Sequence, residues 1–329
     1  MVKLPDSLRP GVFVHTCVVR AGAQGGGLRR AALAGQAAPG APAGPVLVRG
    51  AEDLAPFGEG TALYEMGLAA LAAGGAPLWA AAAGQDYAAA LSALAAQEGV
   101  GVLVSDGGGQ ALRQLLEEGA AAGREQVGIL AGGDPQEAAQ LAGELASARV
   151  AVACDGGQAT HATAAAFGAQ VAARGADGGL NGLWVDCPPP SQGGLTPAQS
   201  AGLLAAGVCP FEPAGEGLCC VRAVTTRTGE GRAWADLAAV LAVDEVVRGV
   251  RAGVAGRLAG QKHTAATRES IASQILVELE AQRQLGRIDR YEPPVVAAHP
   301  QDPAVCVATL RFQVAPELGQ ILLAAEILV

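Results

Sequence analysis

Aromatic side chains and charges are scarce in this sequence. Phe, Trp and Tyr account for 3% of its 329 residues and charged residues for 16%, whereas half are hydrophobic and 47 are glycine. The chain is long enough for two or three domains with a sizeable core. Because aromatic bulk is missing, that core must be built from Ala, Val and Leu.

Positive charge is scarce as well. The 22 Lys and Arg against 31 Asp and Glu give a formal net charge of −9. This argues against nucleic acid as the main partner, because phosphate binding needs a basic surface. No secretion signal is recognisable where Lys3 is followed by Pro5 and Asp6. No apolar run reaches the ~18 residues of a membrane span. We therefore expect a soluble protein made in the cytoplasm, with no membrane partner.

The sequence lacks the motifs of metal sites. Its seven cysteines form no Cys-x-x-Cys pair, and its four histidines form no His-x-x-x-His or His-Glu-x-x-His frame. A free cysteine in apolar surroundings behaves as a small hydrophobe. We expect mostly buried thiols, no metal and no cofactor. The residues concerned are Cys17, Cys154, Cys187, Cys209, Cys219, Cys220 and Cys306, and His15, His161, His263 and His299.

Three glycine-rich turns follow predicted strands, in VGVLVSDGGGQALRQLL, LAGGDPQEAAQL and ACDGGQATHAT. A glycine loop between a strand and a helix can hold phosphate on its backbone N–H groups. The first turn, however, lacks both the Gly-x-Gly-x-x-Gly fingerprint and the Gly-Lys-Ser/Thr of a P-loop. We interpret all three as ordinary turns, with a nucleotide site as the alternative.

A Ser/His/Asp site could in principle be assembled from Asp155, His161 and Ser191. No serine stands in Gly-x-Ser-x-Gly, and the spacing fits no protease order. We therefore predict no catalytic residues and interpret these side chains as loop and helix-cap residues. The alternative is a small-molecule-binding α/β enzyme with an oligomerising C-terminal domain.

Short apolar runs alternate with helical patterns from Glu52 to about Val224. This alternation predicts an α/β architecture with a largely parallel sheet. The predicted strands are 45–49, 76–82, 100–104, 127–131, 150–154 and 183–185. The predicted helices are 59–73, 86–98, 110–122, 135–145, 160–173 and 196–204.

Two long helices are predicted in the last hundred residues, after an apolar run at 221–226. The second starts near Thr264 or Thr267, both reasonable N-caps, and Gly286 is placed to end it. Apolar residues at three- and four-residue steps put one stripe on each helix. The stripes are Val240, Val243, Val247, Val250, Val254 and Leu258 in the first helix, and Ile271, Ile275 and Leu279 in the second.

Strand patterns follow these helices. Residues 305–314 alternate in polarity, which predicts one half-buried strand. Residues 321–329 are apolar at eight of nine positions. An unpaired apolar strand tends to pair with another chain, so this segment either returns to its own sheet or joins a neighbour.

The order of these segments resembles the sheath proteins of contractile tails, found in phages, tailocins and related injection systems. The resemblance covers most of the chain and is loosest in the middle, where Leu28, Ala31 and Leu33 could form a short strand as in that family. It is carried by LRPGVFVHTCV, VRAVTTRTG, the helix with Trp234, the helix at 264–285, RIDRYEPPVV, VATLRFQVAPELGQI and the apolar last segment.

The resemblance implies a mixed α/β and α+β fold. Its parts are an N-terminal arm at 1–20, an α/β sheath body at 21–224, a C-terminal α+β sheath domain at 225–314 and a C-terminal strand arm at 315–329. It also implies a structural subunit, not an enzyme, that polymerises in stacked six-fold rings around a tail tube and contracts to drive the tube through a cell envelope. The implied partners are further copies of the chain, the tube protein, and baseplate and tail terminator proteins. The implied location is a virion or tailocin particle assembled in the bacterial cytoplasm.

In such sheaths the two arms add strands to the C-terminal domains of neighbouring subunits. β-Augmentation of this kind supplies main-chain hydrogen bonds and apolar pockets together. The N-terminal arm residues are Val12, Phe13, Val14, His15 and Val18. The C-terminal arm residues are Ile321, Leu322, Leu323, Ile327, Leu328 and Val329, and the acceptor strand holds Cys306, Ala308, Leu310 and Phe312.

Charged residues concentrate between residues 248 and 290. They include Arg248, Arg251, Arg257, Lys262, Glu280, Arg287, Asp289 and Arg290. The ordinary interpretation is a solvated helix face with i,i+4 pairs. Under the resemblance, part of this face would contact the tube, and the candidates are Arg268, Glu269, Glu278 and Arg283.

Overall fold

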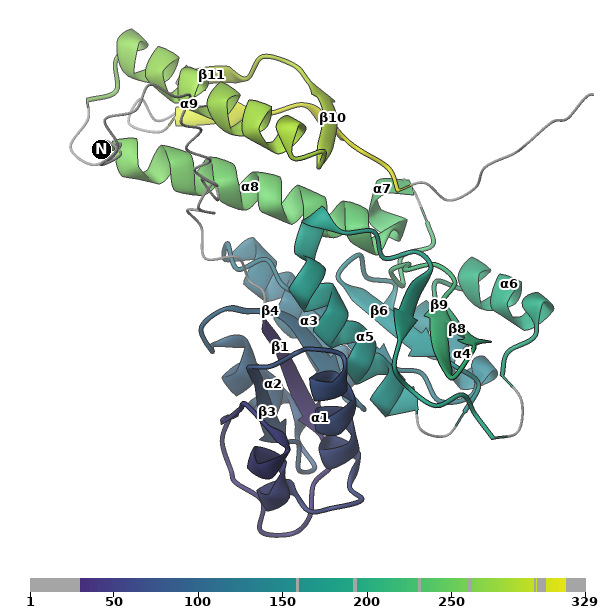
Figure 1. Cartoon of the computed structure of the whole chain (residues 1–329). Helices are drawn as coiled ribbons and strands as arrows, with labels where there is room; N and C mark the ends of the chain where they lie inside the picture. The colour runs from purple at the N-terminus through teal and green to yellow at the C-terminus, as the bar shows by residue number, and fades with distance from the viewer. Residues whose placement is uncertain are drawn as a thin grey trace, which may run out of the picture.

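The structure, a computed structural model, describes residues 30–157, 160–191, 194–229, 232–258, 262–298, 300 and 306–317. Within them, a nine-stranded sheet forms the body, and two long helices with two short β-ribbons form a C-terminal unit. In Figure 1 the helix α8 runs across one end of the body, and α9 and the ribbons lie beyond it. Of the two predicted arms, residues 1–20 and residues 318–329 lie outside the described residues, whereas residues 315–317 of the C-terminal arm are described.

The sheet of the body has the strand order β2-β3-β1-β4-β5-β6-β8-β9-β7. The neighbours from β3 to β8 pair in parallel, and the pairs β2–β3, β8–β9 and β9–β7 are antiparallel. A largely parallel sheet is therefore confirmed. The strands are β1 Arg30–Gly35, β2 Val46–Val48, β3 Leu78–Ala82, β4 Val100–Ser105, β5 Val127–Ala131, β6 Val150–Cys154, β7 Leu183–Val185, β8 Cys209–Ala214 and β9 Gly217–Cys220.

Helices cover both faces of this sheet. The helices α1 and α5 pack on one face, and α2, α3, α4 and α6 pack on the other. Buried on both faces, the central strands are continuous apolar runs, as parallel strands usually are. The helices are η1 Ala51–Phe57, α1 Ala62–Ala72, α2 Tyr87–Ala95, α3 Gly109–Ala121, α4 Pro135–Leu145, α5 Thr160–Arg174, η2 Gly175–Asp177 and α6 Pro197–Ala205.

Small residues let these layers approach closely, as the aromatic-poor sequence predicts. A Cβ placed on Gly168 of α5 would lie 2.3 Å from the Cγ2 atom of Val104 in β4, so only glycine allows the helix to lie directly on the sheet. Next to it, Phe167 meets Phe211 of β8 edge-on, with ring centroids 5.2 Å apart. The rest of the core is mainly Ala, Val and Leu.

Two features of the body differ from expectation. The antiparallel strands β8 and β9 were not anticipated, and the prolines Pro210 and Pro213 weaken the strand pattern of β8. The apolar run at 221–226, which under the family resemblance would be a strand followed by a turn, does not form a strand. Only Val224 forms an isolated bridge, to Asp236, while the N–H of Thr226 donates to the carbonyl oxygen of Val150 at 2.8 Å. The threonine pair therefore ties the chain to the end of the sheet instead of extending a strand.

Both long helices of the C-terminal unit are confirmed. Thr264, the first of the two candidate caps, accepts a hydrogen bond from the N–H of Thr267, and Gly286 follows the helix with φ 74°. The predicted stripe of α9 is buried. In α8 the most buried valines are Val240 and Val246, not Val247. The elements are α7 Arg232–Ala235, α8 Leu237–Leu258, α9 Ala265–Gln284, β10 Ile288–Tyr291, β11 Val295–Ala298, β12 Cys306–Thr309 and β13 Phe312–Val314.

The helix α8 belongs to both parts of the molecule. Leu237 and Val240 join the apolar core of the body, whereas Val246 packs with the buried stripe of α9. The division between 21–224 and 225–314 therefore stays a prediction, because α8 packs on both units. Among the described helices, none is long and apolar enough to cross a membrane.

Candidate assembly surfaces

The predicted acceptor segment forms two strands instead of one. β12 pairs with β11, and β13 pairs with β10, both antiparallel. The ladders are interrupted where Pro293 and Pro294 face Leu310 and Arg311, since proline has no N–H to donate. One hydrogen bond, from the N–H of Glu292 to the carbonyl oxygen of Arg311 at 2.9 Å, bridges the gap. A single continuous strand at 305–314 is thus wrong, and a broken antiparallel ribbon takes its place.

The inner face of this ribbon packs on α9. Cys306, Leu310 and Phe312 are half-buried against the cluster formed by Ile271, Ile275 and Leu279. Ala308 is exposed. Of the four predicted acceptor residues, three therefore contribute to the subunit's own small core.

The outer face of the ribbon is apolar although it faces solvent. Val295 is 63% exposed and Val307 is 42% exposed, and they share this face with Ala297 and Thr309. In the described part of the chain the ribbon consists of two separate strand pairs, β10–β13 and β11–β12. The outer edge of each strand therefore carries main-chain groups without a strand partner. Such an edge is a template for an added strand.

The four candidate tube-facing residues lie in different environments. Glu278 lies against α8, where a Cβ on Gly253 would be 2.9 Å from its Oε1 atom. Arg283 pairs with Glu280 at 2.7 Å, and the Tyr291 hydroxyl also donates to that carboxylate at 2.9 Å. Arg283 and Glu269 are exposed and Arg268 is half-exposed on α9. Glu278 therefore lies between α8 and α9, away from the exposed face that carries the other three candidates.

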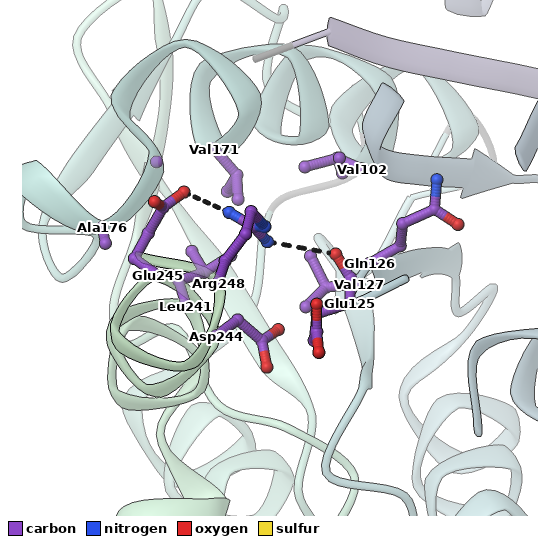
Figure 2. Close-up of a pocket in the computed structure, with 12 residues that line it drawn as sticks. Val102, Glu125, Gln126, Val127, Val171, Ala176, Leu241, Asp244, Glu245 and Arg248 are labelled. Carbon is purple, nitrogen blue, oxygen red and sulfur yellow. Dashed lines mark hydrogen bonds and ion pairs between the residues drawn. The ribbon is translucent and has the colours of Figure 1, made fainter. Parts of the chain in front are cut away.

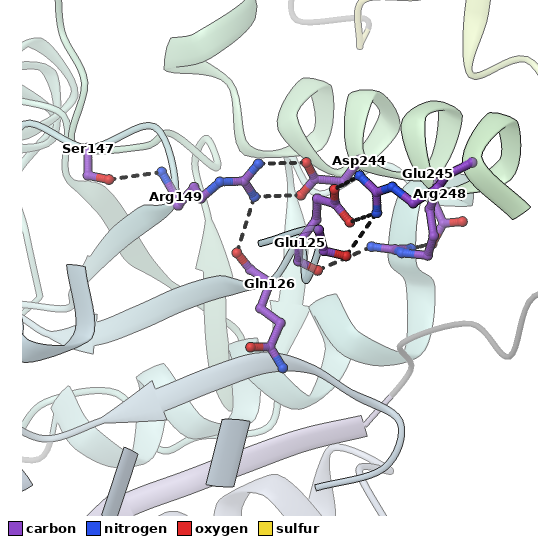
Figure 3. A network of polar contacts seen from close by, with 9 residues as sticks. Glu125, Gln126, Ser147, Arg149, Asp244, Glu245 and Arg248 are labelled. Carbon is purple, nitrogen blue, oxygen red and sulfur yellow. Dashed lines mark hydrogen bonds and ion pairs between the residues drawn. The ribbon is translucent and has the colours of Figure 1, made fainter. Parts of the chain in front are cut away.

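Charged side chains join α8 to the body, as Figure 3 shows. The guanidinium of Arg149, at the start of β6, donates two hydrogen bonds to Asp244 of α8 at 2.8 and 2.9 Å. Arg251 donates to both oxygens of Glu125, at 2.6 and 3.1 Å. Arg248 pairs with Glu245 and donates to the Glu125 carbonyl oxygen. We call these six residues the body–helix clamp.

The clamp shows that Arg248 and Arg251 are both paired: Arg248 is half-buried, whereas Arg251 is exposed and holds the buried Glu125. Figure 2 shows Arg248 above a small pocket between the body and α8, with Val102 and Val171 on its wall. Burial alone would lower the pKa of Arg149, but its hydrogen bonds to Asp244 outweigh this and raise that pKa. Burial opposes ionisation of Glu125 as well, yet the hydrogen bond from Arg251 holds its pKa below the usual value. The Asp244 carboxyl shows the opposite balance, because burial raises its pKa more than the hydrogen bonds from Arg149 lower it.

The first glycine turn is covered by the chain itself. Tyr87 lies on it so closely that a Cβ on Gly108 would be 2.4 Å from the Tyr87 Cβ. The Tyr87 hydroxyl donates to Asp106 at 2.7 Å, and Asp106 also accepts from the N–H of Gln36 at 2.9 Å. Burial and the Asp106 carboxylate raise the pKa of Tyr87 to about 12. These side chains fill the place at the carboxyl ends of β1 and β4 where an open α/β sheet would hold a ligand.

The Ser/His/Asp residues are not brought together as a catalytic group. His161 makes a 2.7 Å contact with Glu65 of α1. Asp155 accepts hydrogen bonds from the hydroxyl groups of Thr160 and Thr163 and from the N–H of Gly157, so its carboxylate ties the loop after β6 to the first turn of α5. Asp155 and Ser191 line one open groove, and His161, although described, is not among the residues that line it.

The six cysteines in the described part of the chain are free thiols. Of the six in the described residues, Cys154, Cys187, Cys209 and Cys220 are buried, while Cys219 and Cys306 are partly exposed. Burial raises the pKa of Cys154 and of Cys187 to about 11, so both are protonated and unreactive at neutral pH. The described part of the chain holds no cluster of three or more His, Cys, Asp or Glu side chains suited to a metal ion.

No sequence motif marks the long-range pairs of the clamp. Glu125, Arg149 and Asp244 are separated by up to about 120 positions and follow no motif. The one available hint is that Asp244 interrupts an otherwise apolar part of α8.

No family model matches the sequence, and no curated protein matches it. Solved structures do. A chain of the extracellular contractile injection system "PVC sheath complex in contracted state" has a TM-score of 0.69 and 13% identity, with 98% of each chain covered. A chain of the anti-feeding prophage baseplate has a TM-score of 0.66 and 13% identity, covering 100% of this chain and 98% of that one.

A sheath tail protein from Listeria innocua is also similar, with a TM-score of 0.65 and 9% identity over 88% of this chain and 92% of that one. At such low identity the likeness establishes the fold. It confirms the expected mixed α/β architecture and agrees with the resemblance noted in the sequence. This chain therefore has, over nearly its whole length, the fold of the sheath proteins of contractile injection systems.

Proposed function

We propose that this chain is a structural subunit of a contractile tail sheath, which polymerises around a tail tube and contracts to drive it through a target envelope. The observation that carries the proposal is the likeness in fold to the contracted PVC sheath complex, which covers 98% of both chains. A likeness over the full length includes the body and the C-terminal unit in one arrangement. It therefore supports a shared assembly role better than a likeness limited to the body would.

The ribbon supports this proposal because it is incomplete as a sheet. Its outer edges have no strand partner in the described residues, and its outward face carries Val295 and Val307. We propose that residues 1–20 and 315–329 act as arms that add strands to the ribbons of neighbouring subunits. The arms would bring the apolar residues needed to cover this face.

The tube contact would lie on the exposed charges of α9. Arg268, Glu269 and Arg283 are the candidates, and Glu278 would act instead between α8 and α9. The further partners are a baseplate and a tail terminator protein, and the particle is a virion tail or tailocin. The subunit does this work without a chemical step, because new subunit contacts supply the energy of contraction.

Electron microscopy of the purified full chain, alone and with a tube protein, tests the proposal. We expect tubes or stacked rings. A matched variant that lacks residues 320–329 should remain folded by circular dichroism but form no tubes, because the arm leaves the core of its own subunit intact. Discrete small oligomers of the full chain, or tubes of normal length from the truncated chain, would contradict the proposal.

The tube contact has a separate test. Reversing Arg268 and Arg283 to Glu should weaken co-assembly with tube protein while self-assembly persists. Reversal of Arg113, an exposed residue of α3 paired with Glu117, provides the control. Equal co-assembly of both variants would assign the α9 charges to solvent.

A further inference from the structure

The base of the ribbon is held to the body at two points. The body contributes the loop at 177–181, which connects η2 to β7, and the ribbon contributes Arg287 before β10 and Glu317 after β13. Arg287 and Ala315 are linked by the last hydrogen bond of this ladder, from the N–H of Ala315 to the carbonyl oxygen of Arg287 at 3.1 Å. Both ends of the ribbon therefore reach the same loop.

Glu317 uses both of its carboxylate oxygens on this loop. Oε1 accepts from the N–H of Leu180 at 2.7 Å, and Oε2 accepts from the N–H of Asn181 at 3.2 Å. Charge-assisted bonds of this kind are stronger than those between neutral groups, and two adjacent donors also fix the direction of the carboxylate. Leu180 is fully buried, so the site of attachment is part of the core.

The loop that receives Glu317 is itself fastened to the sheet. The Asn181 side-chain oxygen accepts from the N–H of Ala223 at 3.0 Å, and the N–H of Gly182 donates to the Cys220 carbonyl oxygen at 2.8 Å. At the other end of the loop, the guanidinium of Arg287 donates to Asp177 at 2.6 Å. Arg287 and Glu317, a cation and an anion at the base of the ribbon, thus bind the two ends of the same loop.

We propose that Glu317 is a positioning residue that anchors the start of the C-terminal arm on the body of its own subunit. This inference rests on the proposed sheath function and adds the point from which the arm departs. The free part of the 315–329 arm would be residues 318–329, and its direction would be set by the carboxylate on the 177–181 loop. Asp177 and Arg287 support the same loop and hold the ribbon base in register.

An anchored start would limit how far the arm can reach. The twelve residues from 318 to 329 span at most about 40 Å when extended. A fixed departure point therefore limits the position of the neighbour that the arm can reach, and the link between two subunits has a defined length. Without the anchor, residues 316 and 317 would add length to the free segment, and the same arm would tolerate a wider range of subunit positions.

Hydrogen exchange on the full-length subunit tests the anchor itself. Glu317→Ala removes both acceptors, so the amides of Leu180 and Asn181 should exchange about tenfold faster or more. Glu317→Gln keeps one acceptor oxygen and should give a smaller increase. The control is Glu118→Ala, whose carboxylate bonds Gln114 one turn away in α3. Unchanged exchange in Glu317→Ala would overturn the anchor whether or not the protein forms tubes.

Cryo-electron microscopy of assembled tubes tests the positioning role. Tubes of Glu317→Ala should show a broader distribution of twist between rings than tubes of the wild type or of Glu118→Ala, and Glu317→Gln should restore much of the uniformity. A role in stability alone would lower the melting temperature and the yield of tubes but leave their twist uniform. Uniform twist in Glu317→Ala would therefore overturn the inference. Absence of tubes from the wild type would instead overturn the sheath proposal and with it the role of the anchor in the arm.

Discussion

The body sheet and the C-terminal ribbon differ in how far their faces are covered and their strand edges are paired. In the body, β1, β4, β5 and β6 are covered by helices on both faces, and each is paired on both edges. In the ribbon, one face packs on α9, the other is exposed, and each strand has one partner in the described residues. The central strands of the body are therefore enclosed on all sides, whereas the ribbon keeps an exposed face and unpaired edges in the described residues.

This difference indicates that the body stabilises the fold, whereas under the proposed function the ribbon would bind other copies of the chain. A buried parallel sheet with close-packed small residues supplies the free energy of folding. An antiparallel ribbon with an apolar outer face contributes little to folding, but it keeps a surface for other chains. The body–helix clamp joins α8 to the body, and α9 packs on α8 in turn.

The largest expected effect is in the body core. Phe167→Ala should lower the free energy of unfolding by about 3–5 kcal/mol, because it leaves a cavity between α5 and β8. Phe312→Ala in the ribbon is the matched control and should cost less, since Phe312 is only half-buried. Urea denaturation measures both. Equal losses would contradict the division into a folding region and an assembly region.

The clamp should give the next largest effect. Asp244→Ala leaves the guanidinium of Arg149 buried without its partner and should cost about 3 kcal/mol. Glu292→Ala, which removes the exposed partner of Arg311, should cost about 1 kcal/mol or less. Replacing Arg149 and Asp244 together by Met and Leu should recover most of the loss. If Asp244→Ala cost no more than Glu292→Ala in the same denaturation experiment, the clamp would be unimportant for stability.

A pH effect should appear at the junction of α9 with the ribbon. The bonds from Arg283, Tyr291 and Gln284 lower the pKa of Glu280 to about 2, against an ordinary value of 4.5. Because the folded pKa is depressed, its stabilising effect is present above about pH 4.5 and is lost as the pH falls toward 2. NMR titration of the Glu280 carboxyl carbon measures this midpoint. A midpoint near 4.5 would show that these hydrogen bonds do not persist in solution, and Glu280→Gln should remove the pH dependence.

The smallest effect on the subunit should come from the outer face of the ribbon. Val295→Ser with Val307→Ser should change the free energy of unfolding by no more than about 0.5 kcal/mol, since both side chains are largely exposed. The same variant should form fewer or shorter tubes, because the added arm loses its apolar contact. Leu68→Ser, on the surface of α1, is the control. Normal tubes from the double variant would show that this face stays in water during assembly.

Local patterns in the sequence determined most elements of this fold. The predicted β5, α4 and β6 agree with the structure at both ends, because a strong apolar run or an Asp-Pro start leaves little choice. The N-cap Thr264, the stripe of α9 and the end at Gly286 were predictable for the same reason. Alternating polarity at 305–314 was real as well, but it could not show that two prolines on the partner segment would split the strand.

Only the tertiary structure decided which distant residues meet. Asp155 and His161 are six positions apart, yet His161 contacts Glu65 on another helix. Arg149 and Asp244, and Glu317 with Leu180, are joined across more than ninety positions. Local periodicity fixes which face of an element is buried, but the partner of a charged side chain depends on how the layers are stacked. For this reason the sequence alone determined the helices and most of the strands, whereas the clamp, the Tyr87 cover on the glycine turn and the Glu317 anchor were decided by the packing of the whole chain.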